Sequence, residues 1–181
     1  MSTKTLITVE QFGQMHFADT EDYELVEGEL VPLSSGTYRH NRSRDLLGHL
    51  LWVYFKGNSI GEAVAENDCR VTSDKVRRPD LSIFLGDRLR QIDLDKIPAP
   101  FAPDIAIEVL SSSEGVMEVR GKVREYLNAG SVEVWLLDHA NREVQVHTQA
   151  GIRVLQATDV LETPLLPGFR VAVADLFMAN S

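Results

Sequence analysis

A strand–helix–strand pattern in the second half of the chain constrains its fold more than any other feature. Residues 104–110 and 133–138 are two runs rich in apolar and β-branched side chains, and the segment between them has helical character up to Asn128, before Gly130. Such a unit predicts a parallel pair of strands joined by a right-handed crossover. Because parallel strands are buried on both faces, we expect helices on the faces of a larger sheet.

The other segments predict shorter elements around this unit. Thr8 and Gln11 have the spacing of a capping box, so a helix should begin at Thr8. Residues 39–56 repeat apolar side chains at helical spacing and predict an amphipathic helix. The remaining predicted elements are two short strands around Gly28 in 23–32, strands at 63–65, 69–71, 80–85, 142–147 and 169–173, a loop at 87–103, a polar turn at 111–115 and a short C-terminal helix.

Together these elements predict a mixed α/β (α+β) fold with a central mixed β-sheet flanked by helices. The chain has 181 residues and no long linker, so we expect one domain over 1–181, with an N-terminal helix within 1–22 and a core at 23–177. Neither a membrane span nor a secretory signal is expected. Cys69 is the only cysteine and is expected to be buried and inert, which favours a cytoplasmic protein.

The formal net charge of −9 counts against a protein that binds nucleic acid through its overall charge. Local basic patches or a metal ion can still act against that average. Two basic clusters could contact a phosphate backbone or could be ordinary solvated faces. They consist of Arg39, Arg42 and Arg44, and of Lys75, Arg77 and Arg78.

Two acids stand out because each accompanies an apolar strand. In 104–110 the alternation of side chains sends Glu108 to the face opposite Ile105, Ile107 and Val109. Asp80 begins the run 80–85 in the same way. Buried ionised carboxylates need a cation or a metal, and two neighbouring acids commonly share a divalent ion. Alternatively, both acids could be solvated at strand ends or paired with nearby basic side chains.

Several short motifs occur in an order that resembles a bacterial family of restriction endonucleases, formerly a domain of unknown function, within the PD-(D/E)XK nuclease superfamily. The resemblance covers residues 23 to 169. The motifs are Tyr23-Glu24-Leu25-Val26-Glu27-Gly28-Glu29-Leu30, Arg78-Pro79-Asp80, Pro103-Asp104-Ile105-Ala106-Ile107-Glu108-Val109-Leu110-Ser111, Lys122 with Tyr126, Ala129-Gly130, Glu133-Val134-Trp135-Leu136-Leu137-Asp138 and Leu166-Pro167-Gly168-Phe169.

The resemblance implies a restriction-endonuclease-like core in which Asp80 and Glu108 bind Mg²⁺, or Mn²⁺ in its place. Glu27 would be a further metal ligand, with Glu29 as its rival. The superfamily lysine is missing two positions after Glu108, where Leu110 stands. By the resemblance Lys122 from the following helix would take that catalytic role, with Arg120 as the substitute.

The same resemblance implies that the substrate is DNA and that His40 contacts it. Arg39 and Arg78 are further candidate substrate contacts, as members of the two basic clusters. Each of these side chains could instead have only a solvent role. Asp138 is expected to be a turn or cap residue rather than a metal ligand. A homodimer is expected on the general ground that two strand cuts suit a two-fold assembly.

Three functions therefore remain open. The first is a Mg²⁺-dependent endonuclease that hydrolyses DNA phosphodiester bonds. The second is a nucleic-acid-binding or regulatory module that keeps the nuclease fold without efficient cleavage, favoured by the acidic net charge and by Leu110. The third is an unrelated metal-dependent hydrolase of nucleotides or small phosphoesters.

Overall fold

A mixed six-stranded sheet forms the centre of the computed structural model, which describes residues 6–18, 21–111 and 114–177. Its strand order is β10-β9-β8-β7-β6-β3. The strands are β3 (Gly61–Ala65), β6 (Leu81–Leu85), β7 (Ile105–Val109), β8 (Glu133–Asp138), β9 (Glu143–Thr148) and β10 (Gly151–Leu155). Only the β7–β8 pair is parallel, which confirms the predicted strand–helix–strand unit; the other pairs in this sheet are antiparallel.

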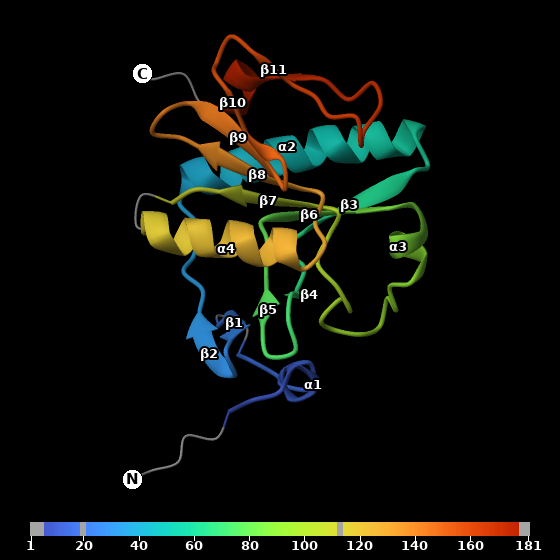
Figure 1. Cartoon of the computed structure of the whole chain (residues 1–181), viewed down its shortest axis with the longest axis vertical. Helices are drawn as coiled ribbons and strands as arrows, with labels where there is room; N and C mark the ends of the chain where they lie inside the picture. The colour runs from blue at the N-terminus through green and yellow to red at the C-terminus, as the bar shows by residue number, and fades with distance from the viewer. Residues whose placement is uncertain (1–5, 19–20, 112–113, 178–181) are drawn as a thin grey trace.

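The longest helix, α2 (Tyr38–Gly57), covers one face of this sheet (Figure 1). Thr37 caps its start by accepting a hydrogen bond from the His40 backbone N–H at 3.3 Å. Its buried Leu47 and Leu51 join a core with Ile105 and Ile107 of β7. Because these residues alternate with Glu108, the side of β7 that faces α2 is apolar, as predicted.

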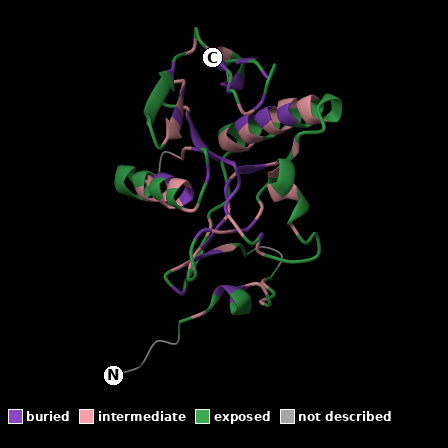
Figure 2. Cartoon of the chain, turned by 45° about the vertical axis from the view of Figure 1, so that its right-hand side comes forward, coloured by how far each residue is buried: buried purple, intermediate pink, exposed green. Residues whose placement is uncertain are grey.

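The second long helix, α4 (Val116–Asn128), covers the opposite face (Figure 1). Val123 and Tyr126 are its buried residues, and they pack with Ala106 of β7 and Val134 of β8. Figure 2 shows that the buried residues concentrate in the strands between the two helices. The C-terminal end of β7 is therefore flanked by a helix on each face of the sheet.

A smaller four-stranded sheet with the order β2-β1-β5-β4 lies beside this core (Figure 1). Its strands are β1 (Tyr23–Val26), β2 (Glu29–Pro32), β4 (Cys69–Arg70) and β5 (Val76–Arg77). The predicted hairpin around Gly28 is confirmed, and its turn has positive φ at both Glu27 (54°) and Gly28 (78°). Positive φ at both central residues is the mark of a type I′ turn, which matches the twist of the two strands.

The N-terminal helix α1 (Val9–Phe12) begins as predicted, with both hydrogen bonds of the Thr8–Gln11 capping box formed. It is a single turn rather than a longer helix in 1–22, and it ends at the C-cap Gly13. A Cβ atom there would lie 2.1 Å from the backbone oxygen of Ile97, so the chain packs too closely against that loop for a larger residue.

Among the described residues, four elements were not predicted, namely a short helix, β10 and the two-residue strands β5 and β11 (Val160–Leu161). The predicted loop at 87–103 contains a short helix, α3 (Gly86–Arg90), which has no side-chain cap. Arg88 holds it by donating to the backbone oxygens of Ala102 and Gly130, contacts that no local pattern reveals. Strand β10 was not predicted either, because its sequence is short and four of its five residues are exposed.

The C-terminal segment packs on the same side of the sheet as α2. Strands β11 (Val160–Leu161) and β12 (Val171–Ala172) pair, and a 3-10 helix, η1 (Val173–Leu176), follows them. Strand β12 lies in the predicted strand at 169–173, and η1 takes the place of the predicted short helix. Two predictions fall partly outside the described residues: the absence of a signal at the chain start, and the polar turn that includes residues 112 and 113. No helix among the described residues is long and apolar enough to cross a membrane.

Cys69 is fully buried and should not react in the folded protein. Burial raises the pKa of its thiol to about 11, although Ser82 and Asn67 partly oppose this by hydrogen bonding. We expect no labelling by iodoacetamide at mildly alkaline pH and complete labelling in concentrated guanidinium chloride, read by mass spectrometry. Rapid labelling of the folded chain would contradict this assignment.

Candidate active site

Asp80 and Glu108 lie on adjacent antiparallel segments at one end of two central strands of the large sheet. In the β6–β7 pair Leu81 is opposite Ile107, and the same register continued by one residue sets Asp80 opposite Glu108. The Val109 backbone N–H donates to Oδ2 of Asp80 at 2.7 Å, which ties the two segments together just before β6 begins. Directly opposed residues of an antiparallel pair have Cβ atoms about 4.5–5.5 Å apart, so both acids face one site.

Glu108 points to the α4 side of the sheet and is 7% exposed. The hydroxyl of Tyr126 donates to its Oε1 at 2.8 Å, and the Nζ of Lys122 lies 4.0 Å from its Oε2. Tyr126 and Lys122 are four residues apart on α4 and so share the helix side that faces β7. One turn of this helix thus supplies both partners of the buried acid.

Lys122 is held from its other side by Glu114, which the sequence analysis did not single out. Its ammonium donates to Oε1 of Glu114 at 3.0 Å, while Oε2 of Glu114 accepts from the Ser111 backbone N–H at 2.8 Å. Arg120, the alternative to Lys122, is exposed and has no acid partner among the described residues. Lys122 is therefore the cation that approaches Glu108.

His40 reaches the site from the first turn of α2. Its Nε2 lies 3.2 Å from Oδ1 of Asp80, and its Nδ1 lies 3.4 Å from the side-chain oxygen of Asn41. Asp80 thus has one oxygen on a backbone N–H and the other on an imidazole. The helices α2 and α4 cover opposite faces of the sheet, and they bring His40 and Lys122 to the same end of β7 (Figure 1).

Burial and neighbouring charges together set the electrostatics of the site. Burial raises the pKa of Glu108 to about 8, with Lys122 lowering it and Asp80 and Glu24 raising it further. Burial disfavours the charge of Lys122, but Glu108, Glu24 and Glu114 outweigh this and raise its pKa. The hydrogen bond to Asp80 raises the pKa of His40, and burial opposes that effect.

Glu24 is an acid near the site that the sequence analysis missed. It is 2% exposed, and its Oε2 lies 2.6 Å from Nη1 of Arg77 while its Oε1 accepts from the Arg78 backbone N–H at 3.0 Å. The available signal was the alternation in β1: Leu25 enters a separate apolar cluster, which sends Glu24 to the other side of the strand. The family resemblance pointed to Glu27 instead.

Glu27 lies away from this group. Its side chain is 75% exposed and its Oε1 is 3.5 Å from Nζ of Lys75, because the type I′ turn presents it to solvent. Its rival Glu29 is also exposed. Neither joins the residues around Asp80 and Glu108.

The basic cluster of Lys75, Arg77 and Arg78 is neither a solvated face nor a set of free cations. Arg78 binds Asp68 at 2.8 Å and also pairs with Asp22. Lys75 and Arg77 both pair with Glu125 of α4, at 2.7 and 2.8 Å. These ion pairs join the small sheet to the core. By contrast Arg39, on the first turn of α2, is exposed.

Asp138 is a turn residue, as expected. Its Oδ1 accepts from the Ala140 backbone N–H at 2.8 Å, and its Oδ2 accepts from the Asn141 side chain at 2.9 Å. A hollow of about 750 Å³ lies elsewhere, around Glu133 and Phe169, and contains none of the site residues. At the candidate site itself the described residues form only a narrow pocket, lined by Glu108, Glu114 and Lys122 among others.

The donor set fits Mg²⁺ bound in part by substrate. Among the described residues, no three His, Cys, Asp or Glu side chains come together as a metal site. Mg²⁺ seldom needs such a cage, since it commonly uses one or two carboxylates and completes its shell with water and phosphate oxygens. Asp80 and Glu108 offer carboxylate oxygens of that kind from opposed positions.

This fold is restriction-endonuclease-like, and it brings Asp80, Glu108 and Lys122 close together. A family model described as "Putative restriction endonuclease" (Uma2) matches residues 9–174, and the chain belongs to that family. No curated protein matches the chain in a comparison of sequences. Among solved structures, a putative nuclease belonging to DUF820 from Anabaena variabilis ATCC 29413 has a TM-score of 0.80 at 22% identity, over 94% of this chain and 97% of that one. Family and fold together support a nuclease-like function.

Proposed function

We propose that this protein is a Mg²⁺-dependent endonuclease that hydrolyses phosphodiester bonds of DNA. One observation carries the proposal: Asp80 and Glu108 stand opposite each other on neighbouring strands, with the ammonium of Lys122 4.0 Å from Glu108. Two carboxylates beside a lysine suit a reaction in which negative charge develops on a phosphate. Membership of a restriction endonuclease family supports the choice of DNA as the substrate.

In this proposal Asp80 and Glu108 hold Mg²⁺, and Mn²⁺ can replace it. When bound, the ion supplies Lewis acidity toward a phosphate oxygen and toward the attacking water. Tyr126 and His40 orient the two carboxylates through the hydrogen bond to Glu108 and the contact with Asp80. Lys122 offsets the charge that develops on the phosphate or orients the water.

The outer residues have different parts. Glu24 replaces Glu27 as the third acid in our proposal, and it acts through its charge on Glu108 and Lys122 because its own oxygens are bound by Arg77 and the backbone N–H of Arg78. We assign no DNA contact to the side chain of Arg78, since Asp68 and Asp22 already bind it. His40 and Arg39 remain the DNA-contacting candidates on α2.

A second candidate is a nucleic-acid-binding module without efficient cleavage. Leu110 stands where the superfamily has its lysine, and the ammonium of Lys122 is bound by Glu114 at 3.0 Å. If Glu114 kept that ammonium away from the phosphate, the site would bind without reacting.

Cleavage assays separate these functions. Supercoiled plasmid, linear duplex, single-stranded DNA and a small phosphodiester are incubated with Mg²⁺, with Mn²⁺ or with EDTA. Metal-dependent cuts in DNA are expected. Hydrolysis of the small phosphodiester alone would favour a small-molecule hydrolase, and DNA binding with no hydrolysis under any condition would favour the binding module. A homodimer is part of the proposal and is tested by light scattering.

Lys122 should matter for the chemical step far more than Arg120. Lys122→Met is expected to lower the rate at saturating DNA by about 10²–10³-fold, the effect typical of removing one charge-stabilising group. Arg120→Met, the matched control on the same helix, should change that rate by only a few-fold. The measurement is single-turnover cleavage, and equal losses in both variants would contradict the assignment of Lys122.

A further inference from the structure

Most basic side chains in the described part of this chain are already neutralised by an acid. Such pairs have nitrogen–oxygen distances within 4.0 Å. They involve Arg44, Arg70, Lys75, Arg77, Arg78, Arg88, Arg90, Lys96, Lys122 and Arg170. In a chain of net charge −9 these paired cations offer little to a polyanion.

Five exposed arginines are different, because within the described residues no acid side chain pairs with them. Arg153 of β10 donates to the backbone oxygen of Glu162, and the other four lie on the two long helices. They are Arg39 and Arg42 on α2, and Arg120 and Arg124 on α4. An arginine ion-paired on a protein surface must give up its partner before it binds phosphate, whereas these four need not. They are therefore the side chains best suited to phosphate contacts.

The positions of these arginines relate them to the candidate site. Arg39 and Arg42 flank His40, which contacts Asp80, and they are three residues apart along α2. Arg120 and Arg124 flank Lys122, which approaches Glu108, and they are four residues apart along α4. Residues three or four apart lie on the same side of a helix, so each pair can contact neighbouring phosphates. Arg120 and Arg124 are two residues from Lys122, and Arg42 is two residues from His40, so these exposed side chains lie on the helix sides turned away from the site.

The two helices lie on opposite faces of the large sheet, and both begin near the C-terminal end of β7 (Figure 1). Each helix thus places one residue at the site and one exposed arginine pair on its solvent side. A duplex that extends past the site over both helices would meet one arginine pair on each side of it. Duplex DNA carries one negative charge for about every 1.7 Å of its axis, so it offers phosphates to both pairs.

We propose that duplex DNA lies across the end of the sheet at which β7 terminates. The Arg39–Arg42 pair binds it on one side of the site, and the Arg120–Arg124 pair binds it on the other. This rests on the proposed function for its choice of DNA, and it adds the path of the duplex and the residues that set its affinity. The paired cations of the small sheet take no part in the grip.

Binding, rather than cleavage, tests the path. Fluorescence anisotropy of a labelled duplex is measured over a range of salt concentrations, with Ca²⁺ and without divalent ions. The proteins are the parent, Arg39→Gln/Arg42→Gln, Arg120→Gln/Arg124→Gln and the fourfold variant. Each double variant should weaken binding at least about tenfold at moderate salt and lower the slope of log K against log salt by about two, since each phosphate contact contributes about 0.9.

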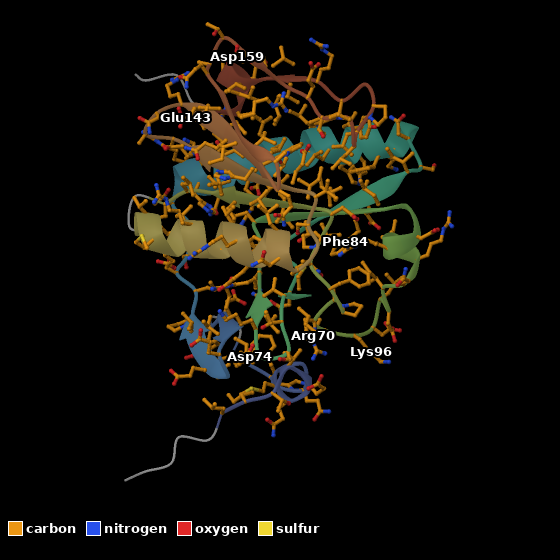
Figure 3. All side chains as sticks on the ribbon, in the orientation of Figure 1. Arg70, Asp74, Phe84, Lys96, Glu143 and Asp159 are labelled. Carbon is orange, nitrogen blue, oxygen red and sulfur yellow. The ribbon has the colours of Figure 1, made fainter. Side chains whose placement is uncertain are left out.

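A matched control is Arg90→Gln/Lys96→Gln, which removes two exposed but acid-paired cations. Lys96 lies at the lower right of Figure 3, whereas α2 and α4 both begin at the left of that view. This control should bind like the parent. All variants should melt close to the parent, because the four arginines have no acid partners to lose.

The fourfold variant should lose the sum of the two slope changes, because both pairs grip the same duplex. Equal binding by the arginine variants and the control would overturn the proposal, as would a parent that binds no duplex or prefers a single strand. If the parent binds as expected but never hydrolyses DNA, the proposed function fails and the DNA path stands.

Discussion

Replacing Glu108 by glutamine should lower the rate of DNA hydrolysis by at least about 10²–10³-fold, and Asp80→Asn should do the same. Both changes keep the size of the side chain and remove one anionic oxygen ligand. Glutamine can still accept the hydrogen bond from Tyr126, and asparagine can still accept from the Val109 N–H, so the fold should persist. Single-turnover cleavage of plasmid with Mg²⁺ measures the effect.

Metal binding offers a readout that does not depend on activity. Mg²⁺ or Mn²⁺ should raise the melting temperature of the parent, because a ligand that binds only the folded state stabilises it. The shift should vanish in Glu108→Gln and in Asp80→Asn. It should remain in Asp87→Asn, where an exposed acid paired with Arg90 is neutralised in the same way. Parental cleavage and melting shifts in both site variants would exclude Asp80 and Glu108 as metal ligands.

Arg77→Met should destabilise the protein by about 3–5 kcal/mol, the usual effect of removing one partner of a buried ion pair. Arg77 is 8% exposed, and its loss would leave Glu24 buried without its cation and Glu125 with only Lys75. The free energy of unfolding from urea titrations measures this. Arg70→Met is the matched control, since Arg70 pairs with the exposed Glu10 and its loss should cost about 1 kcal/mol or less.

A double-mutant cycle separates the ion pair from other effects of the substitution. Glu24→Gln in the Arg77→Met background removes the uncompensated charge, so the double variant should be more stable than Arg77→Met alone. If Arg77→Met and Arg70→Met cost the same, or if the cycle shows additive effects, Arg77 does not neutralise a buried acid. The assignment of Glu24 as an acid that acts on Glu108 and Lys122 would then lose its support.

The pattern of the sequence was sufficient for the elements whose signals are local. The capping box at Thr8, the helix around Leu47, the hairpin at Gly28 and the strand–helix–strand unit all formed as predicted. Their signals are side-chain alternation, helical spacing and turn chemistry, which act over a few residues. Helix α3 lacked such a signal, because the contacts of Arg88 that hold it come from distant loops.

The site followed the same division. Alternation along 104–110 indicated that Glu108 leaves the apolar face, and the family resemblance drew attention to Asp80, Lys122 and His40. The spatial relation between these residues depended on the register of β6 and β7 and on two helices that begin near the same end of β7 on opposite faces of the sheet. Glu24 escaped notice because its partner Arg77 is 53 residues away in the chain. Glu114 is only eight residues from Lys122, but their contact depends on how the turn before α4 folds back onto the helix.

By itself the sequence determined the apolar and polar faces of each strand and helix, because these depend on the periods of the backbone. Only the tertiary structure decided which charged side chains form ion pairs with one another and which remain available to a binding partner. Lys75, Arg77 and Arg78 look like a basic patch in the sequence but are neutralised by Glu125, Glu24 and Asp68. Pairing of charges depends on distances of a few ångströms between residues that are far apart in the chain, and only the folded arrangement sets those distances.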